Sequence, residues 1–197
     1  MMMQPITEIP DKLPRTNSKL SAWLAQKILK LSGWKVVGEL PNEAKVIMAV
    51  APHTSNWDFI LGILVKFSFN LKVSFLGKSS IFIWPFSLWL KSVGGIAVDR
   101  SNAHGVVGQI VNEFNNQSQL ILGIAPEGTR SKVTKWKTGF LQIAQQANIP
   151  VVPVQLDFKH KQVMFFTKRM VSTDIDKELA DIQSLFSPHC AKKPQNF

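Results

Sequence analysis

The amino-acid sequence predicts an α/β fold in which helices flank a mostly parallel central sheet. Short apolar runs typical of buried strands alternate along the chain with longer segments whose apolar residues recur at helical spacing. Strands that alternate with helices favour parallel pairing with right-handed crossovers. At 197 residues, the chain has the length of a single domain with an ordinary core.

The expected elements follow one another from Val46 onward. Strands are expected at residues 46–51, 72–76, 95–98 and 119–124, and helices at residues 55–70, 84–92, 103–116, 138–147 and 173–186. Two more strands, 151–158 and 162–166, are separated only by three charged or polar residues and are expected to form a hairpin. The pattern leaves the strand order open, and residues 187–197 form a polar tail.

The first 34 residues are expected to form a lead-in and a surface helix, ahead of a domain that spans residues 35–197. Residues 1–17 are polar and contain prolines, which is typical of a loose segment. After the N-cap residue Ser18, one helical face carries the apolar residues Leu20, Trp23, Leu24, Ile28 and Leu31. Because lysines lie opposite and beside this face, the helix suits a membrane surface; a helix packed on the domain with solvated lysines is the alternative.

The charge balance predicts a polyanionic partner. Lysine and arginine total 23 against 13 for aspartate and glutamate, which gives a formal net charge of +10. Nucleic acid, an anionic lipid surface and a phosphorylated substrate all fit this charge. Nucleic acid is the least favoured, because the lysines are spread along the chain rather than grouped with stacking aromatic residues.

The sequence also bears on the compartment. No stretch reaches the roughly 18 uninterrupted apolar residues of a membrane-spanning helix, and the first fifteen residues do not resemble a secretory signal. We therefore expect a protein of the cytosolic compartment. The single cysteine, Cys190, allows no intrachain disulfide and is assigned no role.

A candidate acid–base pair follows the first expected strand. Pro52 ends this strand and Ser55 is suited to cap the next helix, so His53 lies at the turn between them. Asp58 follows one helical turn beyond the cap, from where its carboxylate can reach back to the imidazole. Such a carboxylate orients a histidine that acts as a general base. The alternative is a solvated loop histidine beside an aspartate that stabilises the helix N-terminus.

Polar residues follow two other expected strands. Arg100 comes after residues 95–98, and Glu127, Gly128, Thr129 and Arg130 come after residues 119–124. In an open α/β sheet, ligands bind outside the carboxyl ends of the strands. These residues are therefore expected to share one edge of the sheet with the histidine pair.

Four short motifs resemble those of the glycerolipid acyltransferase family. His53 and Asp58, separated by four residues, match the first motif, and residues 94–100, which end in Asp99-Arg100, look like the second. Residues 126–131, Pro-Glu-Gly-Thr-Arg-Ser, match the third, and residues 149–153 look like the fourth. The motifs occur in the family's order and cover roughly residues 45–160 of the sequence printed above.

The resemblance implies a glycerol-3-phosphate acyltransferase-like fold and transfer of a fatty acyl group to a lysophospholipid hydroxyl, as in phospholipid biosynthesis. The donor would be acyl-CoA or an acyl carrier protein thioester, and neither a metal nor another cofactor would be needed. His53 would act as the base and Asp58 would orient it. Residues that would position the acceptor are Arg100, Glu127, Gly128, Thr129, Arg130 and Lys137, and Pro150 would shape the cleft on the acyl side.

The expected protein is thus a peripheral O-acyltransferase on the cytoplasmic face of a membrane. The implied acceptor is 1-acyl-glycerol-3-phosphate, although Thr138 interrupts a basic segment that some family members have near the phosphate, so a different lyso-lipid is an alternative. A catalytically inactive, basic lipid-binding module is the rival from another class of function.

Overall fold

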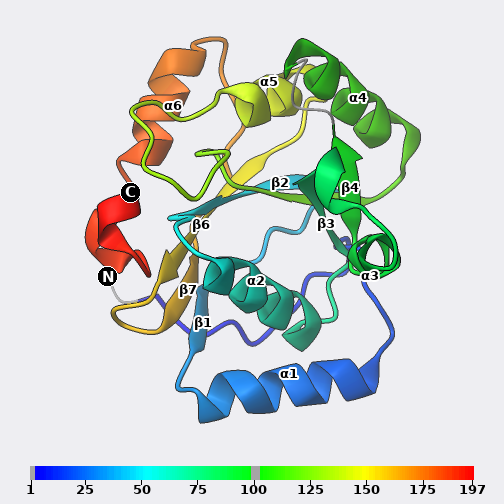
Figure 1. Ribbon diagram of the computed structural model, residues 1–197, viewed down its shortest axis with the longest axis vertical. Coiled ribbons are helices and arrows are strands. Elements are labelled where there is room, and N and C mark those ends of the chain that lie inside the picture. Colours follow the sequence, from blue (N-terminus) through cyan, green and yellow to red (C-terminus); the bar gives the residue numbers. More distant parts are fainter. Residues whose placement is uncertain (1–2, 99–102) are drawn as a thin grey trace.

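The computed structural model describes residues 3–98 and 103–197 and shows one sheet between two layers of helices (Figure 1). The strands are β1 (Lys35–Gly38), β2 (Lys45–Ala51), β3 (Val73–Lys78), β4 (Gly95–Val98), β5 (Leu120–Ile124), β6 (Val151–Asp157) and β7 (Gln162–Phe165). The helices are α1 (Lys19–Leu31), α2 (Asn56–Ser68), α3 (Phe86–Ser92), α4 (Ala103–Asn116), α5 (Gly139–Gln146) and α6 (Ile175–Gln183), with short 3₁₀ turns η1 (Ser79–Ile81), η2 (Pro188–Cys190) and η3 (Pro194–Asn196).

The strand order is β1-β7-β6-β2-β5-β3-β4. All neighbouring pairs are parallel except β6 and β7, which form the expected antiparallel hairpin. The α/β fold with a mostly parallel sheet is therefore confirmed. Because Ala49 of β2 pairs with Ile124 of β5, the loops that follow these two strands leave the sheet at the same edge.

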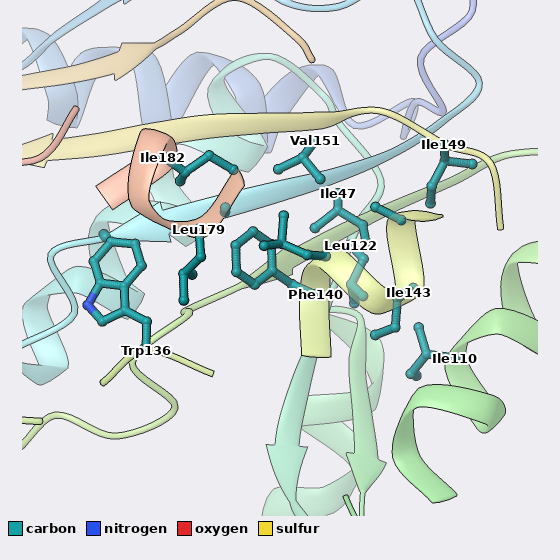
Figure 2. Close-up of a cluster of buried hydrophobic side chains, with 14 of the residues drawn as sticks. Ile47, Ile110, Leu122, Trp136, Phe140, Ile143, Ile149, Val151, Leu179 and Ile182 are labelled. Carbon is teal, nitrogen blue, oxygen red and sulfur yellow. The ribbon is translucent and has the colours of Figure 1, made fainter. Parts of the chain in front are cut away.

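Two apolar clusters fill the spaces between the sheet and its helices. On one face, Ile47 and Leu122 pack against Phe140 of α5 and Ile182 of α6, within the cluster that Figure 2 shows. On the other face, side chains of α1 and α2 pack against the alternate residues of the strands, such as Met48. Side chains of β2 alternate between the two clusters, as expected for a central strand that is buried on both faces.

The segment 3–17 is packed against the domain, contrary to the expectation of a loose lead-in. The Ile6 N–H donates to Val36 O at 3.2 Å and the Lys72 N–H donates to Pro14 O at 2.8 Å. Leu13 is 1% exposed and belongs to the same cluster as α2. This mostly polar segment is therefore attached to the domain by a few contacts, and composition alone does not reveal such contacts.

The polar tail is ordered in a similar way. Cys190 is buried, and its Sγ accepts from Gln155 Nε2 at 3.1 Å. Phe197 packs on Trp136 with 6.1 Å between ring centroids. Burial and the nearby Asp157 carboxylate raise the pKa of the Cys190 thiol to about 11. The tail thus contributes to the core, and a raised pKa keeps this buried thiol in its protonated form at neutral pH.

We expect Leu13→Ala to lower the free energy of unfolding by about 2–5 kcal/mol, because it removes a fully buried side chain from the core. Leu20→Ala, at a side chain that is 75% exposed, is the matched control and should change it by less than about 0.5 kcal/mol. Urea denaturation measures both. Equal, small effects would mean that the segment 3–17 does not contribute to the core in solution.

Candidate active site

The turn between β2 and α2 is organised around the carboxylate of Asp58. Its Oδ2 accepts from the main-chain N–H groups of Thr54 at 2.6 Å and Ser55 at 2.7 Å, and its Oδ1 accepts from the Ser55 hydroxyl at 3.0 Å. Ser55 is the N-cap of α2, and the reciprocal side-chain to main-chain bonds between Ser55 and Asp58 form a capping box. Asp58 is only 3% exposed, and its carboxylate is therefore held in one orientation.

His53 faces this carboxylate. Its Nδ1 lies 3.3 Å from Asp58 Oδ2, and its imidazole is 22% exposed whereas the Asp58 side chain is 1% exposed. Nδ1 is thus directed at a buried carboxylate, and no described residue forms a hydrogen bond with Nε2. The structure brings together the two residues of the expected pair in the arrangement that a general base requires. Asp58 serves as helix cap and histidine partner at once, so the two interpretations of this aspartate are not exclusive.

Glu127 forms a hydrogen bond with the main chain of the turn that carries His53. Its Oε1 accepts from the His53 main-chain N–H at 2.9 Å, and the residue is 4% exposed. Its Oε2 is buried and meets no hydrogen-bond donor among the described residues. Burial, outweighing the two main-chain hydrogen bonds, raises the pKa of the Glu127 carboxyl. Glu127 contacts the His53 turn and is not among the residues that line the cavity described below, so its expected part in holding the acceptor stays a prediction.

The loop after β5 brings polar groups to the same edge. Gly128 has a φ of +68°, a backbone conformation that favours glycine, and the end of the Lys137 side chain packs on it, 2.9 Å from where a Cβ would lie. Thr129 and Arg130 are exposed beside it. No ion pair joins Arg130 to Glu127 in the described parts of the chain, which leaves this guanidinium available to a ligand.

A largely apolar cavity of about 1320 Å³ opens at this edge and continues beneath α2. His53 and Asp58 line it together with the polar residues Gly128, Thr129, Arg130, Lys135 and Lys137. Its apolar walls include Phe59, Ile63, Phe75, Ile81 and Leu90. A cavity with a basic mouth and apolar walls suits a ligand that has an anionic head and a hydrocarbon chain.

Lys66 also lines this cavity, about two helical turns along α2 from Asp58. Its Nζ donates to the main-chain carbonyls of Val73 at 2.9 Å and of Val93, and so joins α2 to β3 and to the turn before β4. Burial lowers the pKa of this lysine to about 8. The sequence offered one signal for it: Asp58, Gly62 and Lys66 recur every four residues and therefore share one face of α2.

Comparisons with known proteins show the family of the chain. The family model described as Acyltransferase matches residues 34–157, which is more than half of the chain. The chain belongs to the acyltransferase family. This acyltransferase-family chain is 27% identical over 162 residues to a 1-acyl-sn-glycerol-3-phosphate acyltransferase of Haemophilus influenzae, covering 77% of this chain and 65% of that protein.

Two further likenesses extend this result. A protein of the same description from Saccharomyces cerevisiae is 32% identical over 129 residues, covering 61% of this chain and 41% of the yeast protein. The acyltransferase-family chain thus spans less than two thirds of the length of either curated relative. The crystal structure of the 1-acyl-sn-glycerophosphate (LPA) acyltransferase PlsC from Thermotoga maritima superposes with a TM-score of 0.52 at 20% identity, covering 85% of this chain and 78% of that one, and supports the fold.

The remaining expected site residues are Pro150 and Arg100. Pro150 precedes β6, and its carbonyl accepts from the Ile47 N–H at 3.1 Å near the start of β2. Because β2 and β6 are parallel, this proline lies at the edge opposite His53 and does not line the cavity, so its expected role on the acyl side stays a prediction. Arg100 lies outside the described residues.

One contributor to the site escaped the sequence analysis of this acyltransferase-family chain. Thr54 is 2% exposed; its Oγ1 accepts from the Lys193 N–H at 3.2 Å, and its carbonyl accepts from Asn196 Nδ2 at 3.4 Å. The turn that carries His53 is therefore held by Asp58 on one side and by the C-terminal segment on the other. Contacts that span some 140 residues leave no local signal in the sequence.

We expect Glu127→Gln to raise the Tm at neutral pH by a few degrees, since the amide still accepts from His53 N–H and has no charge to desolvate. The raised pKa of Glu127 means that the folded chain holds this proton more tightly than the unfolded chain. The stability that the carboxyl contributes is therefore present below its unfolded pKa of 4.5 and is lost as the pH rises through the folded value.

The gain in Tm of Glu127→Gln should accordingly grow as the pH is raised from 4.5, as thermal unfolding followed by circular dichroism will measure. Glu39→Gln, at an exposed glutamate, is the control and should show no such trend. A gain that is the same at acid and neutral pH would contradict a desolvated carboxyl at position 127.

Proposed function

We propose that this chain transfers a fatty acyl group from a thioester donor to the hydroxyl of a lysophospholipid, with 1-acyl-glycerol-3-phosphate as the first candidate acceptor. The observation that carries the proposal is the oriented His53–Asp58 pair at the mouth of an apolar cavity of about 1320 Å³. Membership of the acyltransferase family and the descriptions of its two curated relatives support the reaction class and the acceptor.

In the proposed reaction, Nε2 of His53 takes the proton of the acceptor hydroxyl as its oxygen attacks the thioester carbonyl. The C–O bond forms, the carbonyl becomes a tetrahedral oxyanion, and its collapse breaks the C–S bond. The imidazolium then returns the proton to the leaving thiolate. Asp58 faces Nδ1, so its negative charge favours the imidazolium that forms during the attack.

Glu127 has a positioning role in this proposal, because it holds the main chain of His53. The acceptor phosphate is assigned to the basic mouth of the cavity, where Arg130, Lys135 and Lys137 lie among the lining residues. No acidic residue occurs between Arg130 and Gln155, so this stretch of the chain carries only positive charge. Thr129 and Gly128 border the same mouth, and Arg100 remains a candidate from the resemblance alone.

We infer that the protein acts as a peripheral protein on the cytoplasmic face of a membrane, with acyl-CoA or acyl carrier protein as donor. None of the described helices is long and apolar enough to cross a bilayer. Helix α1 packs on the domain through Ala22, Ala25 and Leu29, which are buried. The opposite face, with Leu20, Trp23, Leu24 and Leu31, is more than half exposed, and Lys27 Nζ lies 6.0 Å from the Trp23 ring centroid. The helix is both packed and apolar on its outer side, which supports surface binding.

We expect His53→Ala to abolish acyl transfer almost completely while leaving the fold intact, and Asp58→Asn to lower kcat by on the order of a hundredfold or more. The assay supplies a labelled acyl thioester and a panel of lysolipids. His160→Ala, at a histidine paired with Asp157 away from the cavity, is the control. Turnover of His53→Ala near that of the unaltered chain would exclude the mechanism, and lipid binding without transfer by any form would indicate an inactive module.

We expect Arg130→Ala to raise the KM for lysophosphatidic acid by on the order of tenfold or more, because a charge-assisted hydrogen bond to phosphate is lost. Hydrolysis of the donor without acceptor should change little. Monoacylglycerol, which has no phosphate, is the comparison substrate. Equal losses on both acceptors would mean that Arg130 has a structural role.

We expect Trp23→Ser combined with Leu24→Ser to release the chain from anionic vesicles. The variant loses apolar side chains of α1, and the electrostatic attraction that remains, about 1 kcal/mol per engaged lysine, is too weak to keep the chain bound. Sedimentation with vesicles at increasing salt measures this binding. Leu185→Ser, at a side chain that is 36% exposed beyond α6, is the matched control. Unchanged sedimentation of the double variant would remove α1 from the membrane-binding surface.

A further inference from the structure

Most of the exposed large apolar side chains belong to three parts of the chain. The described residues include 15 large apolar side chains that are exposed, and 13 of them belong to α1, α2 or the segment 81–89. That segment alone contributes Ile81, Ile83, Trp84, Phe86, Leu88 and Trp89, of which Trp84 is 81% exposed. Six exposed apolar side chains within nine residues indicate a site of interaction with a partner or a membrane.

The segment 81–89 lies on the same face of the sheet as α2. The ring of Phe59 in α2 lies 5.0 Å from that of Phe75 in β3 and 6.3 Å from that of Trp89 in α3, measured between centroids. Figure 1 shows α3 beside β4 at the edge of the sheet, with α2 next to it. Helix α2, which carries the exposed residues Trp57 and Ile60, is therefore in contact with the segment through Phe59.

The base of the segment is fixed by close packing on two glycines. A Cβ at Gly77 would lie 2.7 Å from Cε2 of Phe82, and a Cβ at Gly95 would lie 2.7 Å from the carbonyl oxygen of Leu90. The absence of side chains at these positions lets the segment rest directly on β3 and β4. Ile83, Trp84 and Phe86 thus project from an anchored base, and their exposure does not result from a loop without contacts.

The charge around the segment matches an anionic partner. Residues 59–98 contain four lysines and no aspartate or glutamate. Two of these lysines, Lys78 and Lys91, are exposed and flank the apolar segment on either side. Apolar side chains that project between lysines, with tryptophans among them, are suited to the boundary between lipid head groups and acyl chains.

The segment 81–89 is continuous with the wall of the cavity beside His53. Ile81, at one end of the segment, and Leu90, just beyond its other end, both line that cavity, as does Phe59. A hydrocarbon chain that passes from this segment into the cavity therefore remains in contact with apolar side chains, and none of it has to cross water.

We propose that residues 81–89 insert into the acyl region of an anionic bilayer and form the entrance through which a lipid chain reaches the cavity beside His53. The proposal rests on the acyl-transfer function proposed above, for which it specifies the route of the lipid substrate. Helix α1 would hold the chain at the surface, whereas the segment 81–89 would penetrate it.

The first test measures insertion. Vesicles of phosphatidylcholine and phosphatidylglycerol with brominated acyl chains quench the fluorescence of tryptophans that enter the bilayer. The amount of fluorescence that the brominated lipids quench should be smaller in Trp84→Phe, which keeps an aromatic side chain and removes the indole. Trp136→Phe, at a tryptophan that is 6% exposed and packed in the core, should leave the quenched signal unchanged. An unchanged quenched signal in Trp84→Phe would overturn insertion, whether or not the chain is an acyltransferase.

The second test measures the route. The variant with Ile83→Ser, Trp84→Ser and Phe86→Ser should transfer acyl groups to lysophosphatidic acid in vesicles at a rate lower by on the order of tenfold or more. With the same acceptor in detergent micelles its rate should stay near that of the unaltered chain. Met170→Ser with Leu185→Ser, at exposed apolar side chains outside α1, α2 and the segment 81–89, is the control.

The outcomes separate the two proposals. Equal losses in vesicles and micelles, or no loss in either, would overturn the entrance. A triple variant that binds vesicles normally but no longer self-associates in light scattering would overturn the proposed entrance. It would mean that residues 81–89 bind a second copy of the chain instead of a bilayer. Failure of the unaltered chain to transfer acyl groups to any acceptor would reject the acyl-transfer function, while the quenching result would still decide insertion.

Discussion

The hydrogen bonds of the Asp58 carboxylate are the interaction on which the rest of the site depends. One buried side chain accepts from two main-chain N–H groups and a hydroxyl, starts α2, and places its charge 3.3 Å from His53 Nδ1. The position of the histidine is therefore coupled to the direction of the helix, and the helix forms one wall of the cavity. A change that altered the cap would move the base and the cavity together.

Much of this arrangement was predictable from the sequence because it is local. The capping residues, the His53–Asp58 spacing and the alternation of strands and helices all depend on neighbours within a few residues, and the expected helix at residues 103–116 has the bounds of α4. The shared edge of the site residues was also predictable, since parallel strands that end together present their following loops together.

The features that escaped prediction depend on contacts between distant parts of the chain. Strand β1 has only four residues, and its partner β7 begins more than a hundred residues later, so no periodicity marks it. Pro150 fits the family motif, yet its place at the start of β6 puts it at the far edge of the sheet. Glu127 was expected near the acceptor on the same ground, whereas its hydrogen bond to His53 N–H directs it inward.

The concentration of exposed apolar side chains on α1, α2 and the segment 81–89 has a consequence for how the molecule searches for its substrate. If α1 and the segment 81–89 bind a bilayer as proposed, diffusion would be confined to the plane of the membrane. Encounter with a lipid would then follow its density per unit of membrane area rather than its concentration in the volume. Adding inert lipid would dilute the substrate for such a molecule, even though the solution around it had not changed.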